Sequence, residues 1–188
     1  MAPATRERII DALRTVLARG GASAVTLEAV AAEAGLSKGG LLYHFKNKES
    51  LYAALLAESE ADVVAQMASR MERMSAARAF LDFALPASEL EAASTSALIA
   101  AVRADDSVGP DAAAALVAGF HRWDEPLLAE VADPVLAQTI RLVGLGLYLG
   151  SVAGIPVPDP QLLAEVTERL VRQAEATAPA AVPRGSGG

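Results

Sequence analysis

The chain has 188 residues, a formal net charge of −7 and 53% hydrophobic residues, a length and composition that can bury a core. It has no cysteine, which excludes disulfides, zinc ribbons and thiol catalysis, and its two histidines, His44 and His121, leave any metal site to rest mostly on carboxylates. Alanine, the best helix former, fills 42 positions and no segment shows the alternation of a strand, so the predicted fold class is all-α.

Two short helices are predicted first. Hydrophobic residues at helical spacing predict a helix over 4–19, which Gly20 and Gly21 should end. Thr26 is the expected N-cap of the second helix, because its hydroxyl can accept a hydrogen bond from a free backbone N–H. Gly35 is expected to end that helix with a positive φ.

A third helix is predicted to begin after Ser37, with Leu41, Leu42 and Phe45 on its inner face. Two helices joined by a turn that contains glycine, within about twenty residues, are the layout of a helix-turn-helix motif. The sequence therefore predicts such a motif near the N-terminus.

The remainder of the chain predicts six further helices. Asn47 is the expected cap of a long helix that reaches about residue 74, with no linker after the third helix. Pro126 is expected to kink or split one of the later helices. The expected later helices are 76–84, 87–104, 110–131, 134–153 and 159–175.

Charge is distributed unevenly along the chain. Residues 1–50 hold seven Lys or Arg and five Asp or Glu, whereas residues 51–188 hold nine and eighteen. All three lysines, Lys38, Lys46 and Lys48, fall within eleven positions. A short basic segment on an acidic protein is typical of a small DNA-reading module, although a solvated surface patch gives the same pattern.

Two segments in register carry a family resemblance: Val-Thr-Leu-Glu-Ala-Val-Ala at 25–31 and Ala-Gly-Leu-Ser-Lys-Gly-Gly-Leu-Leu-Tyr-His-Phe-Lys-Asn-Lys-Glu-Ser-Leu at 34–51. This stretch resembles the N-terminal signature of TetR/AcrR-family transcriptional regulators. The resemblance implies a helix-turn-helix DNA-binding domain (1–50) and a helical effector-binding and dimerisation domain (51–176), and the Ala-, Pro- and Gly-rich composition of 177–188 predicts a disordered tail. The resemblance further implies a homodimeric repressor that a small hydrophobic or cationic effector releases from a pseudo-palindromic double-stranded DNA operator, with no cofactor and no enzymatic activity.

The resemblance also implies which residues meet DNA. Family members make phosphate contacts at the positions of Thr26, Tyr43, His44 and Lys48, and Lys38, Gly40 and Tyr43 are the candidates for base contact. Gly39 and Gly40 cost roughly 2 kcal/mol of helix propensity, which a close approach of the backbone to DNA would explain, as would a frayed first turn. The predicted DNA-binding residues are Thr26, Ser37, Lys38, Gly39, Gly40, Tyr43, His44, Lys46 and Lys48.

An effector pocket is implied by the same resemblance. Aromatic residues recur at a spacing of three in the C-terminal part, and such side chains with methionines suit a flat hydrophobic or cationic compound. Ordinary core packing explains the same spacing. The predicted effector-binding residues are Met67, Met71, Phe80, Phe83, Leu98, Phe120, Trp123 and Tyr148.

The last two helices predict a dimer interface. The segment 134–153 is apolar on nearly every face, and 159–175 has one apolar stripe, so both need cover. Two copies could form a four-helix bundle across a two-fold axis, or both helices could complete the monomer core. The predicted interface residues are Ile140, Val143, Leu147, Gly150, Leu162, Val166 and Leu170.

Other classes of protein were weighed against this interpretation. Residues 35–39 match G-x-S-x-G, but that nucleophile motif follows a strand and here it follows a helix, so Ser37 is expected to be a cap. A helical-bundle enzyme and a protein-interaction module without DNA binding remain the alternatives. No secretory signal opens the chain and the longest uncharged stretch, 142–158, is short for a membrane span, so we expect a cytoplasmic protein.

Overall fold

Side-chain caps fix where the helices of the N-terminal part begin. The computed structural model describes residues 4–104 and 108–177, and these contain α1 (Thr5–Ala24), α2 (Leu27–Glu33), α3 (Lys38–His44) and α4 (Lys48–Met71). The Thr26 hydroxyl accepts from the N–H of Ala29 at 3.0 Å, and the Ser37 hydroxyl accepts from the N–H of Gly40 at 3.1 Å. The Asn47 side chain accepts from the N–H of Ser50 at 2.8 Å. All three predicted caps are confirmed.

The sequence misplaced one detail of this region and was right about another. As predicted, the first run of helix is interrupted at the glycine pair, where Gly21 is non-helical with a φ of +66°, and a further short stretch of helix continues to Ala24. Leu42 does not join the inner face of α3: it is 37% exposed, whereas Leu41 and Phe45 are buried. In a helix of 100° per residue Leu42 points away from the direction that Leu41 shares with Phe45. Gly35 has the expected positive φ, at +67°.

The described C-terminal part is also entirely helical. Its elements are α5 (Ala76–Phe83), α6 (Glu89–Ala104), α7 (Ala112–Glu130), α8 (Pro134–Val152) and α9 (Pro160–Thr177). Pro126 does not split α7, since Trp123 and Leu127 on either side of it are both buried and hold one helix against the core. Residues 178–188 of the predicted tail lie outside the described residues.

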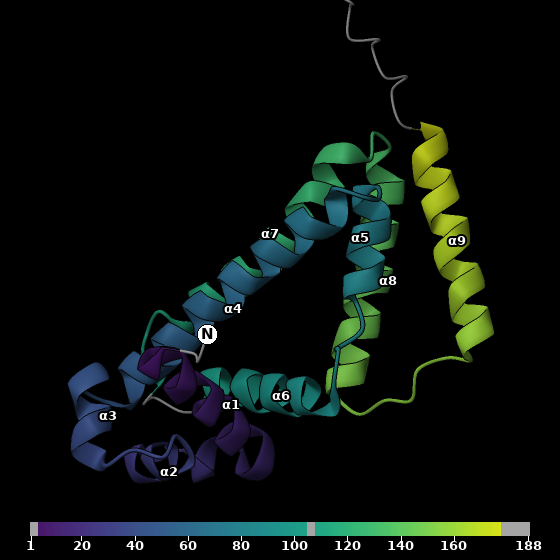
Figure 1. The fold of residues 1–188 in the computed structure, drawn as a ribbon. Coiled ribbons are helices and arrows are strands. Elements are labelled where there is room, and N and C mark those ends of the chain that lie inside the picture. Colours follow the sequence, from purple (N-terminus) through teal and green to yellow (C-terminus); the bar gives the residue numbers. More distant parts are fainter. Residues whose placement is uncertain (1–3, 105–107, 178–188) are drawn as a thin grey trace, which may run out of the picture.

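Two hydrophobic cores lie at opposite ends of α4 (Figure 1). The N-terminal core is formed by α1, α2, α3 and the start of α4, and α6 and α7 complete it with Leu98, Ala101 and Ala112. The C-terminal core is formed by α5, α7, α8 and α9, and α4 contributes Met67 to it. The N-terminal core therefore extends past residue 50 into the helices of the C-terminal part.

The helix α8 stands out for its apolar surface. Within the described residues it is the one helix long and apolar enough to cross a membrane by length and composition, which by itself is weak evidence for a span. One side of α8 packs into the C-terminal core through Ala137 and Ile140. The other side leaves Val135, Leu142 and Leu149 exposed, so the monomer covers α8 only in part.

Candidate nucleic-acid interface and ligand cavity

The helix α3 presents one face to the core and the opposite face to solvent. Leu41 is fully buried, and the guanidinium of Arg6 lies 4.5 Å from the centre of the Phe45 ring beneath the end of the helix. Tyr43, on the opposite side, is 86% exposed and meets the ring of His44 edge-on. Lys46, just after the helix, is exposed as well. The outer face of α3 thus offers a phenol, an imidazole and an ammonium group to a partner.

The two glycines in the first turn of α3 have no internal reason to be glycine. Neither has a positive φ. A Cβ at Gly39 would meet only the Ser37 hydroxyl at 3.9 Å, and one at Gly40 would lie 3.4 Å from the same atom. Larger residues would therefore fit inside the monomer, and what the glycines keep open is the space outside α3.

An ion pair that the sequence did not predict joins α2 to α3. The Lys38 ammonium lies 2.6 Å from a carboxylate oxygen of Glu28, and both side chains are largely exposed. The hydrogen bond from Lys38 is the main reason why the pKa of Glu28 lies below its ordinary value. Lys38, a predicted DNA-binding residue, therefore already has a partner within the monomer. The exposed acid in the first turn of α2 was the available signal.

All nine predicted DNA-binding residues lie between the cap of α2 and the first turn of α4, and none is buried. The Lys48 ammonium sits 5.7 Å from the centre of the Tyr52 ring, at the N-terminus of α4. These elements gather at one end of the molecule (Figure 1). The structure therefore brings the predicted set together.

An aromatic inner chamber of about 90 Å³ lies between α4, α6, α7 and α8. Trp123, 2% exposed, is its centre: the indole stacks on Phe80 at 4.5 Å and meets Phe83 and Tyr148 at centroid distances of 5.4 and 5.3 Å. The chamber wall includes five predicted effector-binding residues: Phe83, Leu98, Phe120, Trp123 and Tyr148.

Several residues of the inner chamber wall carry polar atoms, among them Trp123, Tyr148 and Thr95. The Trp123 Nε1 is buried without a hydrogen-bond partner among the described residues, a costly state for a donor. The Tyr148 and Thr95 side chains are hydrogen-bonded to each other, and burial raises the pKa of Tyr148. Gly119 also lines the chamber, and a Cβ there would meet nothing within 4 Å. Sequence reasoning missed Thr95 and Gly119, since neither residue type marks a pocket.

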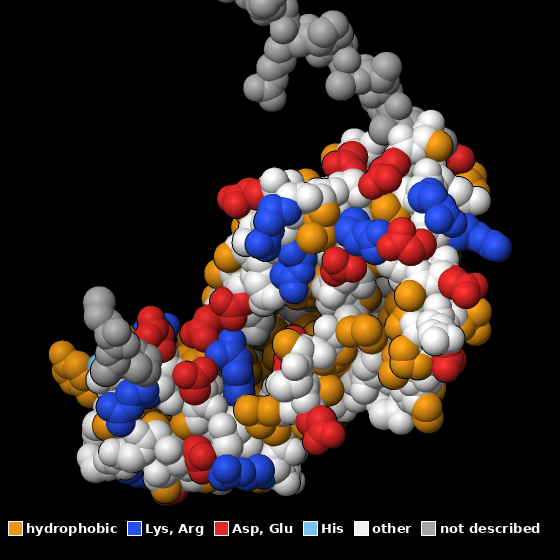
Figure 2. Space-filling model, turned by 45° about the vertical axis from the view of Figure 1, so that its right-hand side comes forward, with side chains coloured by type: hydrophobic (Ala, Val, Ile, Leu, Met, Phe, Trp, Pro, Cys, Tyr) orange, Lys and Arg blue, Asp and Glu red, His pale blue; other side chains and the backbone are white. Residues whose placement is uncertain are grey.

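An outer chamber of about 350 Å³ continues from the inner one and shares Val63, Thr95 and Tyr148 with it. Its further lining includes three charged side chains: Arg14 from α1, Asp62 from α4 and Glu91 from α6. Figure 2 shows a hollow on this face of the molecule with hydrophobic side chains inside it. Because pockets for drug-sized ligands measure about 300–1,000 Å³, such a ligand would need the outer chamber as well as the inner one.

Three predicted effector-binding residues line neither chamber. Phe80 is fully buried behind the indole of Trp123. Met67 lies one turn beyond Val63, where α5 packs on α4, and its side chain enters the C-terminal core. Met71 borders a separate surface depression beside Arg122.

The predicted dimer residues divide between the core and the surface. Ile140 and Leu170 are buried in the C-terminal core, since the α8 and α9 faces that carry them turn toward the rest of the monomer, and they are unavailable to a second copy in this conformation. The other five line an apolar groove of about 420 Å³ between α8 and α9: Val143, Leu147, Gly150, Leu162 and Val166. Leu142, at the edge of the groove, is 66% exposed.

Ser37, the one candidate nucleophile in the sequence, has a structural role. Ser37 caps α3, and the segment before it is the helix α2, so the strand-turn-helix of a nucleophile elbow is not formed. Across 4–104 and 108–177, no three His, Asp or Glu side chains cluster closely enough to hold a metal ion.

Comparisons with known proteins place the chain in a family. The family model described as "Bacterial regulatory proteins, tetR family" matches residues 9–55, and "Tetracyclin repressor-like, C-terminal domain" matches residues 74–175. No curated protein matched the sequence.

Solved structures share the fold. A transcriptional regulator from Rhodococcus sp. Rha1 is 22% identical with a TM-score of 0.68, covering 96% of this chain and 100% of its own. A protein described as a transcriptional regulator from Streptomyces coelicolor A3(2) gives the same identity and TM-score over 90% and 99%. The multidrug binding protein EbrR, complexed with malachite green, is 26% identical with a TM-score of 0.61 over 90% and 99%. The two matched family models span both cores, and the chain therefore belongs to the TetR family of bacterial regulatory proteins.

Proposed function

We propose that this protein is a homodimeric repressor that binds a pseudo-palindromic operator and is released from it by a small hydrophobic or cationic effector. The observation that carries the proposal is the outer face of α3, where Tyr43 and Lys46 stand in solvent while Leu41 and Phe45 anchor the helix. A recognition helix needs this division between an apolar inner face and a polar outer face. In a dimer, two such helices would enter successive major grooves about 34–36 Å apart or somewhat more.

The dimer would form through α8 and α9. The groove between them is apolar, and Leu142 and Leu162 stand exposed at it. A second copy related by a two-fold axis would bury the same patch from both sides, as a self-complementary interface does. A protein that acts on operators in this way works in the cytoplasm.

The effector would occupy the two joined chambers. Aromatic rings of Phe120, Trp123 and Tyr148 surround the inner chamber, and Asp62 and Glu91 line the outer one. Such a site favours a flat molecule, and a cationic one through ring faces and carboxylates. The binding of malachite green, a triarylmethane cation, by EbrR is consistent with this class of effector.

The first experiment is to sequence the genomic fragments that the purified protein retains. Enrichment of fragments that share one inverted repeat is expected. Failure to retain any fragment would instead favour a protein-interaction module that has lost DNA binding.

Filling the inner chamber tests the effector role. Gly119→Leu places a side chain in open space, so the fold should persist while effector binding falls at least about tenfold, the effect of losing one well-packed contact surface. Ala113→Leu, at an exposed position on the same helix, is the matched control. Operator affinity without effector should equal that of the wild type in both variants. Unchanged effector release by Gly119→Leu would contradict the assignment of the cavity.

A further inference from the structure

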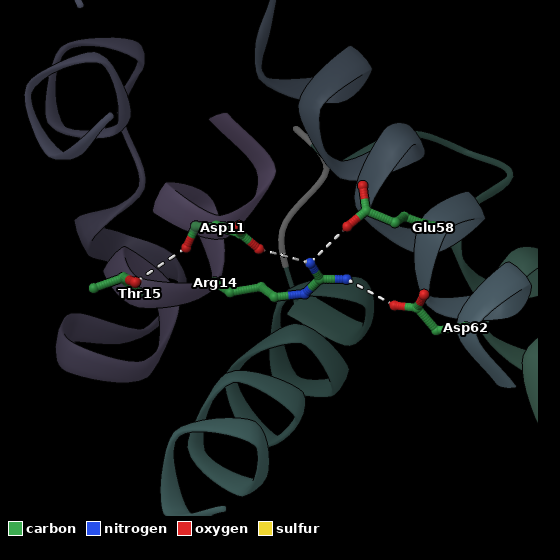
Figure 3. Close-up of polar contacts among 5 residues, drawn as sticks. All are labelled: Asp11, Arg14, Thr15, Glu58 and Asp62. Atoms are coloured by element: carbon green, nitrogen blue, oxygen red, sulfur yellow. Dashed lines mark hydrogen bonds and ion pairs between the residues drawn. The ribbon is translucent and has the colours of Figure 1, made fainter. Parts of the chain in front are cut away.

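Arg14 crosses from the DNA-binding part of the molecule to the helix that lines the cavity. Its Nη1 lies 2.7 Å from Oε1 of Glu58, and its Nη2 lies 3.5 Å from Oδ2 of Asp62. The same Nη1 is 3.2 Å from Oδ1 of Asp11 on its own helix. Figure 3 shows the guanidinium reaching from α1 between these carboxylates, two of which stand one turn apart on α4.

The ion pair between Arg14 and Asp62 is part of the cavity wall. Arg14 and Asp62 both line the outer chamber, beside Ser59 and Val63, which line the inner chamber as well. The Arg14 side chain is half-buried, and so is that of Glu58, so solvent screens their attraction less than that of a fully exposed pair.

The charges around Arg14 leave room for another cation. Three carboxylates face the single guanidinium, and the outer chamber itself is lined by Asp62 and Glu91 against one cation, Arg14. The longest of the three contacts is the one to Asp62, and Asp62 is also the one of the three carboxylates that lines the outer chamber. Deeper in, Phe120, Trp123 and Tyr148 line the adjoining inner chamber, and aromatic side chains of this kind bind flat cations through their ring faces.

We propose that Arg14 occupies the site of the effector's positive charge, so that a cationic aromatic ligand in the two chambers displaces Arg14 from Asp62 and Glu58 and thereby frees α1 from α4. The inference rests on the proposed effector site and names its ligand class and its coupling to DNA. Ligand and guanidinium compete for the same carboxylates. A protein state that keeps the ion pair therefore binds the ligand less tightly, and this difference in affinity is what an effector needs to shift an equilibrium.

The displacement has a short path to α3. On the same helix α1, Nη2 of Arg8 donates to the carbonyl of Ala34 at 2.7 Å, in the turn that precedes α3. Leu13, next to Arg14, is fully buried in the N-terminal core with Leu41 of α3. A shift of α1 relative to α4 therefore moves the platform on which α3 rests.

The experiment measures binding of malachite green to the full-length protein and to Arg14→Gln. Without its internal competitor the outer chamber should bind the dye about threefold to tenfold more tightly, the range expected for one partly exposed ion pair. The uncharged leuco form of the dye should show no such gain. Arg19→Gln is the matched control, because Arg19 is an exposed residue of the same helix that pairs with Glu33 away from the cavity.

A second variant and a second readout complete the test. Asp62→Asn should weaken dye binding about threefold or more and leave the leuco form unaffected. The ratio of operator affinities without and with dye should be smaller for Arg14→Gln than for Arg19→Gln, because the link that the dye breaks is already absent.

The outcomes separate this inference from the proposed function. If wild-type protein binds the dye and releases its operator fragment, but Arg14→Gln binds the dye no more tightly than Arg19→Gln, then the inference is overturned and the proposed function stands. If wild-type protein does not bind the cation, the inference is overturned as well, and retention of genomic fragments decides the DNA-binding role independently.

Discussion

The two ends of the molecule both expose side chains that could bind a partner, but their chemistry is opposite. At the α3 end these are a phenol and ammonium groups, which water solvates well. At the α8–α9 end they are Leu142, Leu162 and Val166, whose exposure to water is unfavourable. The polar surface at α3 therefore suits a reversible, salt-dependent contact, whereas the apolar surface at α8 and α9 suits a stable protein interface.

The largest effect is expected at the apolar end. Leu142→Asp puts a charge into the proposed dimer interface, and burial of an unpaired charge should raise the dimer dissociation constant by roughly 100-fold or more. Analytical ultracentrifugation over a concentration series measures this constant. Leu128→Asp, at an exposed leucine of α7 away from the groove, is the control. A dimer of undiminished affinity in Leu142→Asp would show that α8 is covered in some other way.

The next effect is expected at the polar end. Tyr43→Ala removes the most exposed side chain of α3 and should lower operator affinity about tenfold, within the range for one lost contact. Because Tyr43 packs on little within the monomer, the melting temperature should stay within about 2 °C of the wild type, as is usual for surface substitutions. Gel-shift titrations at one fixed salt concentration give the affinity. Affinity equal to the wild type would remove Tyr43 from the DNA-contact set.

The smallest effect on operator affinity is expected from removing Glu28, the carboxylate that pairs with Lys38. Glu28→Gln frees Lys38 and removes a negative charge beside it, so operator binding should tighten about threefold at low salt and less at high salt. Glu33→Gln, at the end of the same helix, is the control. Equal affinities for the two variants would mean that Lys38 does not reach DNA.

A change of pH should act on the same ion pair. Because Lys38 lowers the pKa of Glu28, the pair is intact above the ordinary pKa of a glutamate and is lost as the pH falls through the lowered value. As the pH falls through that range, the operator affinity of the wild type should therefore approach the operator affinity of Glu28→Gln, as gel-shift titrations at several pH values would show. A difference in operator affinity that does not shrink would contradict the assigned role of the pair.

Local signals in the sequence predicted most helix starts and most of the buried face of α3, but they could not predict which residues of the later helices reach the cavity. Thr26, Ser37 and Asn47 act within three residues of themselves, so residue type and spacing suffice to recognise them as caps. Phe80 and Phe83 share one spacing on α5, yet only Phe83 reaches the cavity. Which of the two does so depends on how α5 packs against other helices, and that is not encoded within α5.

Contacts between distant residues were beyond the same reasoning. Arg14 and Glu58 lie 44 positions apart, and nothing in either segment names the other. The apolar pattern of α8 indicated that every side of the helix needed cover. It did not show that the monomer itself covers the side with Ile140 and leaves the side with Leu142 exposed. Sequence periodicity shows how much apolar surface a helix has, but it does not show which other helix covers that surface.

Leu56 and Leu98 have a double position: both belong to the N-terminal core and both line the inner chamber. A molecule bound in the inner chamber would thus contact residues of the N-terminal core directly, without intervening side chains. If the proposed effector site is right, a substitution at either leucine would alter the ligand cavity and the packing of the DNA-binding end at the same time. Gly119 and Phe120 line the same chamber but lie outside the N-terminal core, so substitutions there would change the ligands that fit while leaving the packing of the DNA-binding end intact.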